Sequence, residues 1–169
     1  MKLKKLLAAV TTGVLAVTSL SLSGLVSSAE VQERMNDTFE SGYGAWKGVG
    51  SSLSLSTEQS HSGGTSLYCY DRTASWGAPR CSLTGIVAAG QSYEISASAM
   101  YEGSGQQNMA IKMIYTDANG TDHYDQVAAA QATAGQWVEM KGNYTVPNGA
   151  TGMILYVETV SYTHLRAHE

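Results

Sequence analysis

The sequence predicts an all-β protein, a two-sheet antiparallel β-sandwich with jelly-roll topology. Several segments alternate apolar and polar residues with a period of two, as strands with one buried face do. No stretch after residue 29 carries a clean helical period. Turn-forming residues separate the alternating segments at the short, regular spacing typical of a sandwich. A barrel enclosing a small ligand is the alternative, but its hairpins would be more even in length than these.

The N-terminus has the features of a secretory signal. Lys2, Lys4 and Lys5 form a positively charged start, an apolar stretch runs over residues 6–25, and small residues at 27–29 offer a cleavage site. We expect residues 1–29 to be a bacterial-type signal peptide removed at Ala29, followed by a short polar leader over residues 30–36, and the protein to be secreted. A retained membrane anchor is disfavoured because hydroxyl residues interrupt the apolar stretch.

Charge narrows the class of partner. Without residues 1–29 the chain keeps 7 basic against 14 acidic residues, a formal net charge of −7. Nucleic acid requires a basic stripe, and the seven basic residues are scattered from Arg34 to Arg166. We therefore expect nucleic acid and acidic polymers to be poor partners and, after signal cleavage, no membrane partner. A neutral polymer such as a polysaccharide is more compatible with this negative net charge.

The strand predictions follow the alternation. The clearest segments are 94–101, 109–115 and 153–158. Weaker candidates are 37–39, 51–57, 65–71, 79–84, 121–130 and 136–146. Turns are expected at 62–64, 119–120 and 147–149, which carry Gly, Asn and Pro. The segment 117–122 resembles a fragment of a calcium-binding loop. Its Asn-Gly pair between two alternating runs favours a hairpin turn instead.

Three residues form the candidate site. Trp76 lies in a connection containing Gly and Ser, where burial is hard to arrange, and Tyr156 and Glu158 are two apart on one predicted strand and so share a face. An aromatic ring stacks on the apolar face of a pyranose, and a carboxylate accepts hydrogen bonds from sugar hydroxyls. The alternatives are that Trp76 packs within its loop and that the strand face is merely solvated. Trp46 and Trp137 are expected in the core.

Catalysis is not indicated. A retaining glycosidase needs two carboxylates a few ångströms apart. Glu94, Glu139 and Glu158 stand alone among apolar or hydroxyl neighbours, and Asp122 and Asp125 fall on opposite faces. The sequence also lacks a Gly-x-Ser-x-Gly elbow and a His-Glu-x-x-His helix.

The chain resembles the carbohydrate-binding modules of families 22 and 4/9. The resemblance rests on the segments 38–40, 44–46, 53–58, 61–67, 72–76, 134–137 and 155–158, and it covers about residues 37–159. It implies a galactose-binding-like sandwich that is non-catalytic, is monomeric within a larger enzyme such as a xylanase, and binds xylan or mixed-linkage β-glucan in an open groove. A calcium-stabilised structural or adhesion sandwich without glycan binding is the alternative.

The resemblance also assigns residues. It implies Trp76 and Tyr124 as groove aromatics, Tyr156 and Glu158 at the groove floor, and Arg72 among the ligand-binding residues. Where xylan-binding members commonly have Arg, this chain has Val49, with Lys47 two residues earlier, which leaves β-glucan or another hemicellulose open as the ligand. The resemblance further implies a structural calcium at Glu40 and at backbone oxygens of residues 61–63.

Two further expectations concern the tail and the cysteines. Residues 160–169 break the strand alternation and resemble translated adapter sequence, so we expect them to be foreign and the natural chain to continue with another strand and a catalytic domain. Cys69 and Cys81 are expected to face each other if 65–71 and 79–84 pair as a hairpin, and a disulfide there would fix the loop carrying Trp76. Two free buried thiols are the alternative.

Overall fold

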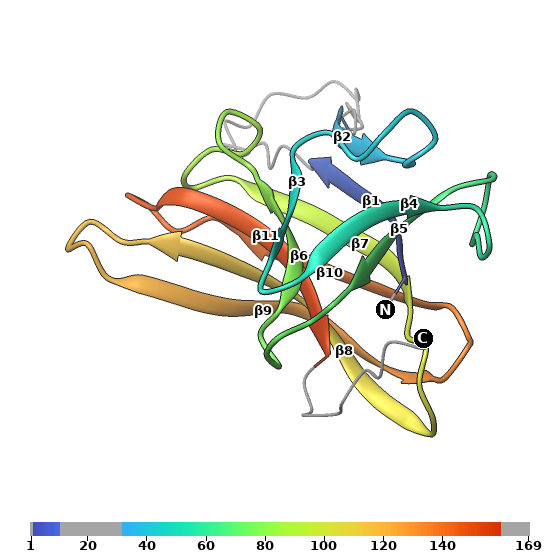
Figure 1. Cartoon of the computed structure of the whole chain (residues 1–169). Coiled ribbons are helices and arrows are strands. Elements are labelled where there is room, and N and C mark those ends of the chain that lie inside the picture. The colour runs from blue at the N-terminus through green and yellow to red at the C-terminus, as the bar shows by residue number, and fades with distance from the viewer. Residues whose placement is uncertain (1, 11–31, 160–169) are drawn as a thin grey trace, which may run out of the picture.

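The chain folds as two antiparallel β-sheets packed face to face. The computed structural model describes residues 2–10 and 32–159, and within them it contains eleven strands and no helix (Figure 1). The predicted two-sheet antiparallel sandwich is confirmed. No helix in the described residues is long and apolar enough to cross a membrane.

The first sheet, sheet A, has six strands. Its order is β10 (Val138–Thr145), β7 (Ser92–Met100), β1 (Lys2–Val10), β5 (Ser66–Tyr70) and β4 (Ser52–Ser56), with β2 (Gln32–Asp37) paired to β1. Most of β2 lies in residues 30–36, the segment expected to be a short polar leader. The expected strand at 37–39 is wrong, because Phe39 takes a positive φ of 63° and the chain leaves the sheet there.

The second sheet, sheet B, has five strands and carries the candidate site. Its order is β3 (Trp46–Val49), β6 (Ala78–Ser82), β11 (Thr151–Thr159), β8 (Gln106–Thr116) and β9 (Asp122–Thr133). The hairpin between β8 and β9 is confirmed. Asp117 accepts hydrogen bonds from the backbone N–H groups of Asn119 and Thr121, at 2.8 and 2.9 Å, and thereby stabilises this turn.

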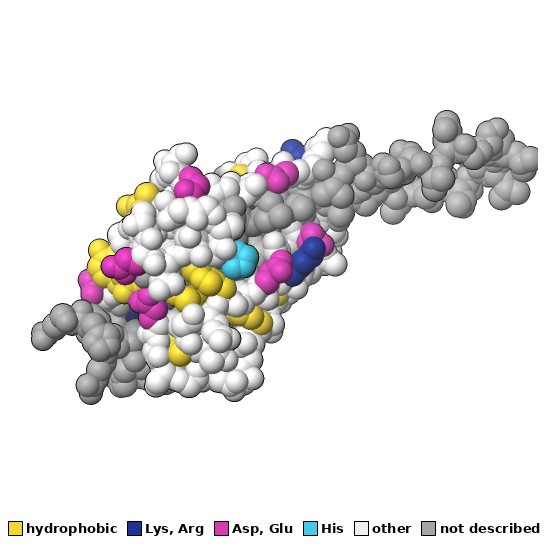
Figure 2. Space-filling model, turned by 90° about the vertical axis from the view of Figure 1, so that its right-hand side faces the viewer, with side chains coloured by type: hydrophobic (Ala, Val, Ile, Leu, Met, Phe, Trp, Pro, Cys, Tyr) yellow, Lys and Arg dark blue, Asp and Glu magenta, His cyan; other side chains and the backbone are white. Residues whose placement is uncertain are grey.

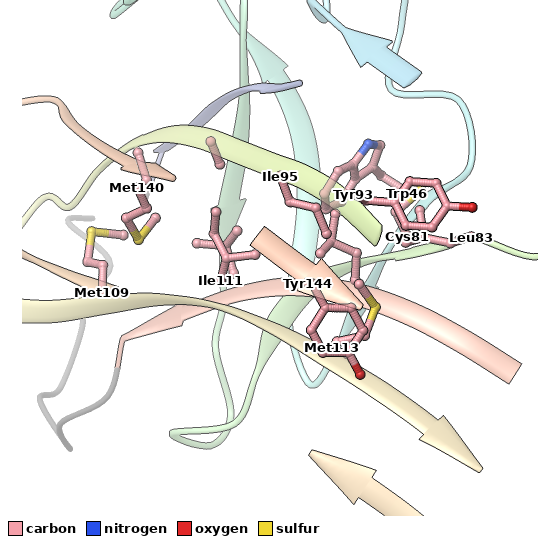
Figure 3. Packing of buried hydrophobic residues seen from close by; sticks show 14 of the residues in the cluster. Trp46, Cys81, Leu83, Tyr93, Ile95, Met109, Ile111, Met113, Met140 and Tyr144 are labelled. Carbon is pink, nitrogen blue, oxygen red and sulfur yellow. The ribbon is translucent and has the colours of Figure 1, made fainter. Parts of the chain in front are cut away.

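The core fills the space between the two inner faces. Alternate residues of β11 such as Leu155 and Val157 are fully buried there, and Trp46 packs beside Tyr93 (Figure 3). The indole Nε1 of Trp46 donates to Asp37 Oδ2 over 2.6 Å, so the expected core role of Trp46 is confirmed. Trp137 is only partly buried, with its ring edge-on to His61, and it lies outside the core cluster.

Strand β1 falls within the segment expected to be a signal peptide. Its backbone pairs with β7 on one side and with β5 on the other. Cleavage at Ala29 would remove β1 and leave the facing edges of β5 and β7 without this partner. The expected cleavage site and the expected foreign tail lie in residues 11–31 and 160–169, outside the described residues.

The predicted hairpin between the two cysteine-containing segments is wrong. β5 lies in sheet A and β6 in sheet B, so the connection between them crosses the sandwich instead of reversing within one sheet. Cys69 and Cys81 are buried thiols, and no disulfide joins them in the structure. Burial raises the pKa of both, that of Cys81 to about 11, which disfavours the thiolate that oxidation requires.

Candidate functional site

The outer face of sheet B brings the predicted floor residues together. Leu155 and Val157 point into the core, so Tyr156 and Glu158 point outward, as their spacing predicts. Tyr156 stands at the centre of this face, because it pairs with Arg80 of β6 on one side and with Lys112 of β8 on the other.

Glu158 is oriented by an ion pair. Its Oε1 lies 2.5 Å from Nζ of Lys112, and the residue as a whole is only 8% exposed. A charge-assisted contact of this length fixes the carboxylate on the face it shares with Tyr156. Glu158 is therefore a preorganised hydrogen-bond acceptor.

Tyr156 lies at the base of the candidate site, and its ring is too buried to offer an open surface for stacking. It is 4% exposed and packs with Ala78, Ile114 and Ile154 in a small apolar cluster separate from the main core. The guanidinium of Arg80 lies over its ring, 5.2 Å from the ring centroid. Burial, reinforced by nearby Glu158, raises the pKa of Tyr156 to about 12, so at neutral pH it is a phenol.

Trp76 stands free of the sheet at the end of the floor where β6 begins. Its side chain lies in the loop between β5 and β6 and is 53% exposed. One edge of the indole rests on Gly50, where an added Cβ would come within 2.6 Å of Trp76 Cζ3. Gly50 also has a φ of +61°, so glycine serves both the turn and the close approach of the ring.

Arg72 holds this loop in place. Its Nε donates to the carbonyl of Gly77 over 2.6 Å, its Nη2 to the carbonyl of Ser75 over 2.5 Å, and its Nη1 to Oγ1 of Thr159 over 2.9 Å. Burial lowers the pKa of Arg72, an effect opposed by Cys69 and Glu158. The expected ligand-binding Arg72 thus has three donor nitrogens engaged within the protein.

Tyr124 occupies the far corner of the same face. It is 62% exposed on β9 and pairs with Ile114 of β8, whereas the Trp76 loop enters at the Ala78 end of β6. The strand registers place the two aromatics at diagonally opposite corners, with Tyr156 between them. The expected groove residues therefore share one surface.

Sequence reasoning missed two contributors to this surface, Arg80 and Lys112. Both occupy outward positions on strands whose partners were not known from the sequence. Lys47, noted only for its distance from Val49, pairs with Arg80. Val49 pairs with Ala78, so that position of the outer face is aliphatic.

The implied calcium residues do not form a typical site. Glu40 Oε1 accepts hydrogen bonds from the backbone N–H groups of Gly64 and Thr65, at 3.0 and 3.1 Å. Calcium requires six to eight oxygen ligands. Within residues 2–10 and 32–159, no three His, Cys, Asp or Glu side chains gather to hold a metal. Glu40 therefore binds the backbone at residues 64 and 65 through two amide hydrogen bonds.

Comparison with known proteins shows the family of this chain. Residues 34–163 match the family described as "Carbohydrate binding domain", and the chain belongs to that family. It is 32% identical over 126 residues to a xylanase/β-glucanase of Ruminococcus flavefaciens, covering 73% of this chain and 16% of that protein. It is 35% identical over 133 residues to endo-1,4-β-xylanase A of Thermotoga neapolitana, covering 75% and 12%.

A solved structure confirms the fold. The xylan-binding domain of a family 22 module superposes with a TM-score of 0.71 at 32% identity, covering 75% of this chain and 84% of that chain. The chain is thus a carbohydrate-binding domain of the non-catalytic family 22 type. It spans only 12–16% of the two xylanases named above.

Proposed function

We propose that this domain binds a single β-linked glycan chain, xylan or mixed-linkage β-glucan, on the outer face of sheet B. The observation that carries the proposal is the half-exposed indole of Trp76, held at the edge of a floor that presents Tyr156 and Glu158. Support comes from relatives whose names describe xylan binding and β-glucanase activity.

Binding would combine stacking with hydrogen bonding. The indole offers an apolar surface for one sugar face, and Tyr124 offers a second at the opposite corner. Between them Glu158 accepts hydrogen bonds from hydroxyls. Because only a few sugar units find an aromatic partner, we expect micromolar to millimolar affinity, about −4 to −8 kcal/mol.

We further propose a setting for the whole protein. The domain would be secreted and would direct an appended glycoside hydrolase, such as a xylanase, to plant polysaccharide. The xylanases that it resembles support this setting. A structural calcium at Glu40 stays a prediction from the family resemblance; comparing the thermal unfolding midpoint in calcium and in chelator tests it, and no step of recognition is assigned to the ion.

Affinity gel electrophoresis tests the proposed function. The protein is run through gels containing xylan, mixed-linkage glucan, cellulose or mannan, with a protein that does not bind sugar as the mobility reference. We expect retardation by xylan or mixed-linkage glucan. Unretarded migration of folded protein in every gel would contradict glycan binding and favour a structural or adhesion role.

A further inference from the structure

We propose that the preferred glycan is acidic: a xylan-type chain that carries uronic acid substituents, whose carboxylate is met by Arg80 and Lys47. The inference rests on the proposed function and names the class of ligand within it.

Three basic side chains form one row across the outer face of sheet B. In the strand register Lys47 of β3 is opposite Arg80 of β6, Arg80 is opposite Tyr156 of β11, and Tyr156 is opposite Lys112 of β8. Neighbouring strands lie about 4.8 Å apart, so the row spans roughly 15 Å, the length of a few sugar units. The row runs through the centre of the candidate site.

Lys47 and Arg80 differ from Lys112 in their ion pairing. Lys112 is paired with Glu158, but within the described residues no ion pair involves Lys47 or Arg80. Asp122, the acid at the hairpin end of the same face, accepts a hydrogen bond from Thr116 at 2.7 Å. Like charges directly opposite each other on neighbouring strands are destabilising. The pair therefore has an electrostatic cost that a bound anion would relieve.

Arg80 also has an unsatisfied donor. Its Nε is buried and has no hydrogen-bond partner in the structure. Because a buried donor without an acceptor costs free energy, such groups are rare in folded proteins. The ring of Tyr156 beneath the guanidinium holds Arg80 at the centre of the outer face of sheet B.

The basic row contrasts with the acidic composition of the remainder of the described chain. Residues 32–159 contain twelve acids but only six bases, and half of the bases lie in this row: Arg34, Lys47, Arg72, Arg80, Lys112 and Lys141 are the six. Figure 2 shows acidic side chains spread over the face that it displays, with few basic ones among them. A basic row on an acidic protein favours an anionic group at that place.

A sugar carboxylate fits the chemistry of the row. A guanidinium binds a carboxylate through two parallel hydrogen bonds, and an ammonium adds a point charge beside it. Hydroxyl groups alone would not require two adjacent cations. Val49 and Ala78 make the next outward position of β3 and β6 apolar.

Calorimetry with two matched ligands tests the inference. One is a linear neutral xylo-oligosaccharide, and the other is the same chain with one glucuronic acid substituent. We expect wild type to bind the acidic ligand about tenfold more tightly at low salt, because charge-assisted hydrogen bonds are stronger than neutral ones, and added salt to reduce this preference. Arg80→Ala and Lys47→Ala should each reduce the ratio of acidic-ligand to neutral-ligand affinity.

Controls separate the outcomes. Lys141→Ala removes a basic residue that pairs with Glu94 on sheet A, and it should keep the full preference. Arg80→Lys should keep part of it, which covers the case in which Arg80→Ala does not fold. Equal wild-type affinity for the two ligands, or a preference that survives in the variants, would overturn the acidic-glycan inference alone. Binding of neither ligand would overturn the proposed function as well.

Discussion

The guanidinium of Arg72 donates from Nη1 to Oγ1 of Thr159 over 2.9 Å and so joins the loop carrying Trp76 to the strand carrying Tyr156 and Glu158. The two residues are 87 positions apart in sequence. Loop and floor are thereby held as one surface before any ligand arrives. Preorganisation of this kind reduces the entropy lost on binding.

Removing this link should weaken binding. In Arg72→Ala the loop must be reordered each time a sugar stacks on Trp76, and ordering a residue costs on the order of 1 kcal/mol. We expect a loss of affinity of about tenfold, measured by calorimetry, with slower quenching of Trp fluorescence by ligand. Thr159→Val removes only the strand contact and should have a smaller effect. Unchanged affinity in a folded Arg72→Ala protein would show that the loop is ordered without it.

Gly50→Ala should displace Trp76. An added Cβ would come within 2.6 Å of the indole, and alanine is strained at a φ of +61°. Gly85→Ala is a matched control, because Gly85 has a φ of +79° and nothing within 4 Å of the added atom. Both variants should lose about 1 kcal/mol of unfolding free energy. Only Gly50→Ala should lose affinity, and equal affinities would mean that the position of the ring does not matter.

Glu158→Gln should weaken binding more than Glu94→Gln. Glu158 shares the floor with Tyr156, whereas Glu94 pairs with Lys141 on sheet A. Loss of a charged acceptor should reduce affinity about tenfold or more. Because Lys112 loses its partner, Glu158→Gln should also be destabilised, by about 1–2 kcal/mol, less than for a fully buried pair. Calorimetry and chemical denaturation measure the two effects, and equal affinity of both variants would place Glu158 outside the site.

The β8–β9 turn should lose stability in acid. The hydrogen bond with His123, followed by the backbone N–H of Thr121, lowers the pKa of Asp117 from 3.8 to about 2. A lowered carboxyl pKa stabilises the fold above the unfolded value, and this contribution is lost as pH falls from about 4 to 2. Asp117→Asn should therefore lower the unfolding midpoint at pH 7, with the difference from wild type shrinking across that window. A difference that is the same at pH 7 and pH 2 would contradict this role.

Features set by residues close together in the sequence could be predicted, whereas features set by pairing between distant strands could not. Alternation predicted the parity of Tyr156 and Glu158, because the faces of a strand are a local property. Asn119 and Gly120 predicted the hairpin for the same reason. The place of Arg80 in the candidate site could be identified only from its register with Tyr156 and Lys47, because strand pairing joins residues far apart in the chain.

The cysteine prediction was wrong for a related reason. Residues 65–71 and 79–84 are close in sequence and both alternate, which is equally consistent with a hairpin and with a crossover between sheets. Long-range contacts decide between them, here the pairing of β5 with β4 and of β6 with β11. Strand β3 was missed because four residues are too few to establish an alternation.

The most direct test of glycan binding on the outer face of sheet B compares Trp76→Ala with Tyr43→Ala. Both remove an exposed aromatic side chain, but Tyr43 precedes β3 at the end of that strand away from Trp76. With a xylo-oligosaccharide in the calorimeter, we predict that Trp76→Ala loses about tenfold or more in affinity, since stacked aromatic contacts contribute on the order of 1 kcal/mol beyond the area they bury, and that Tyr43→Ala binds as wild type does. Wild-type affinity in folded Trp76→Ala protein would contradict the account.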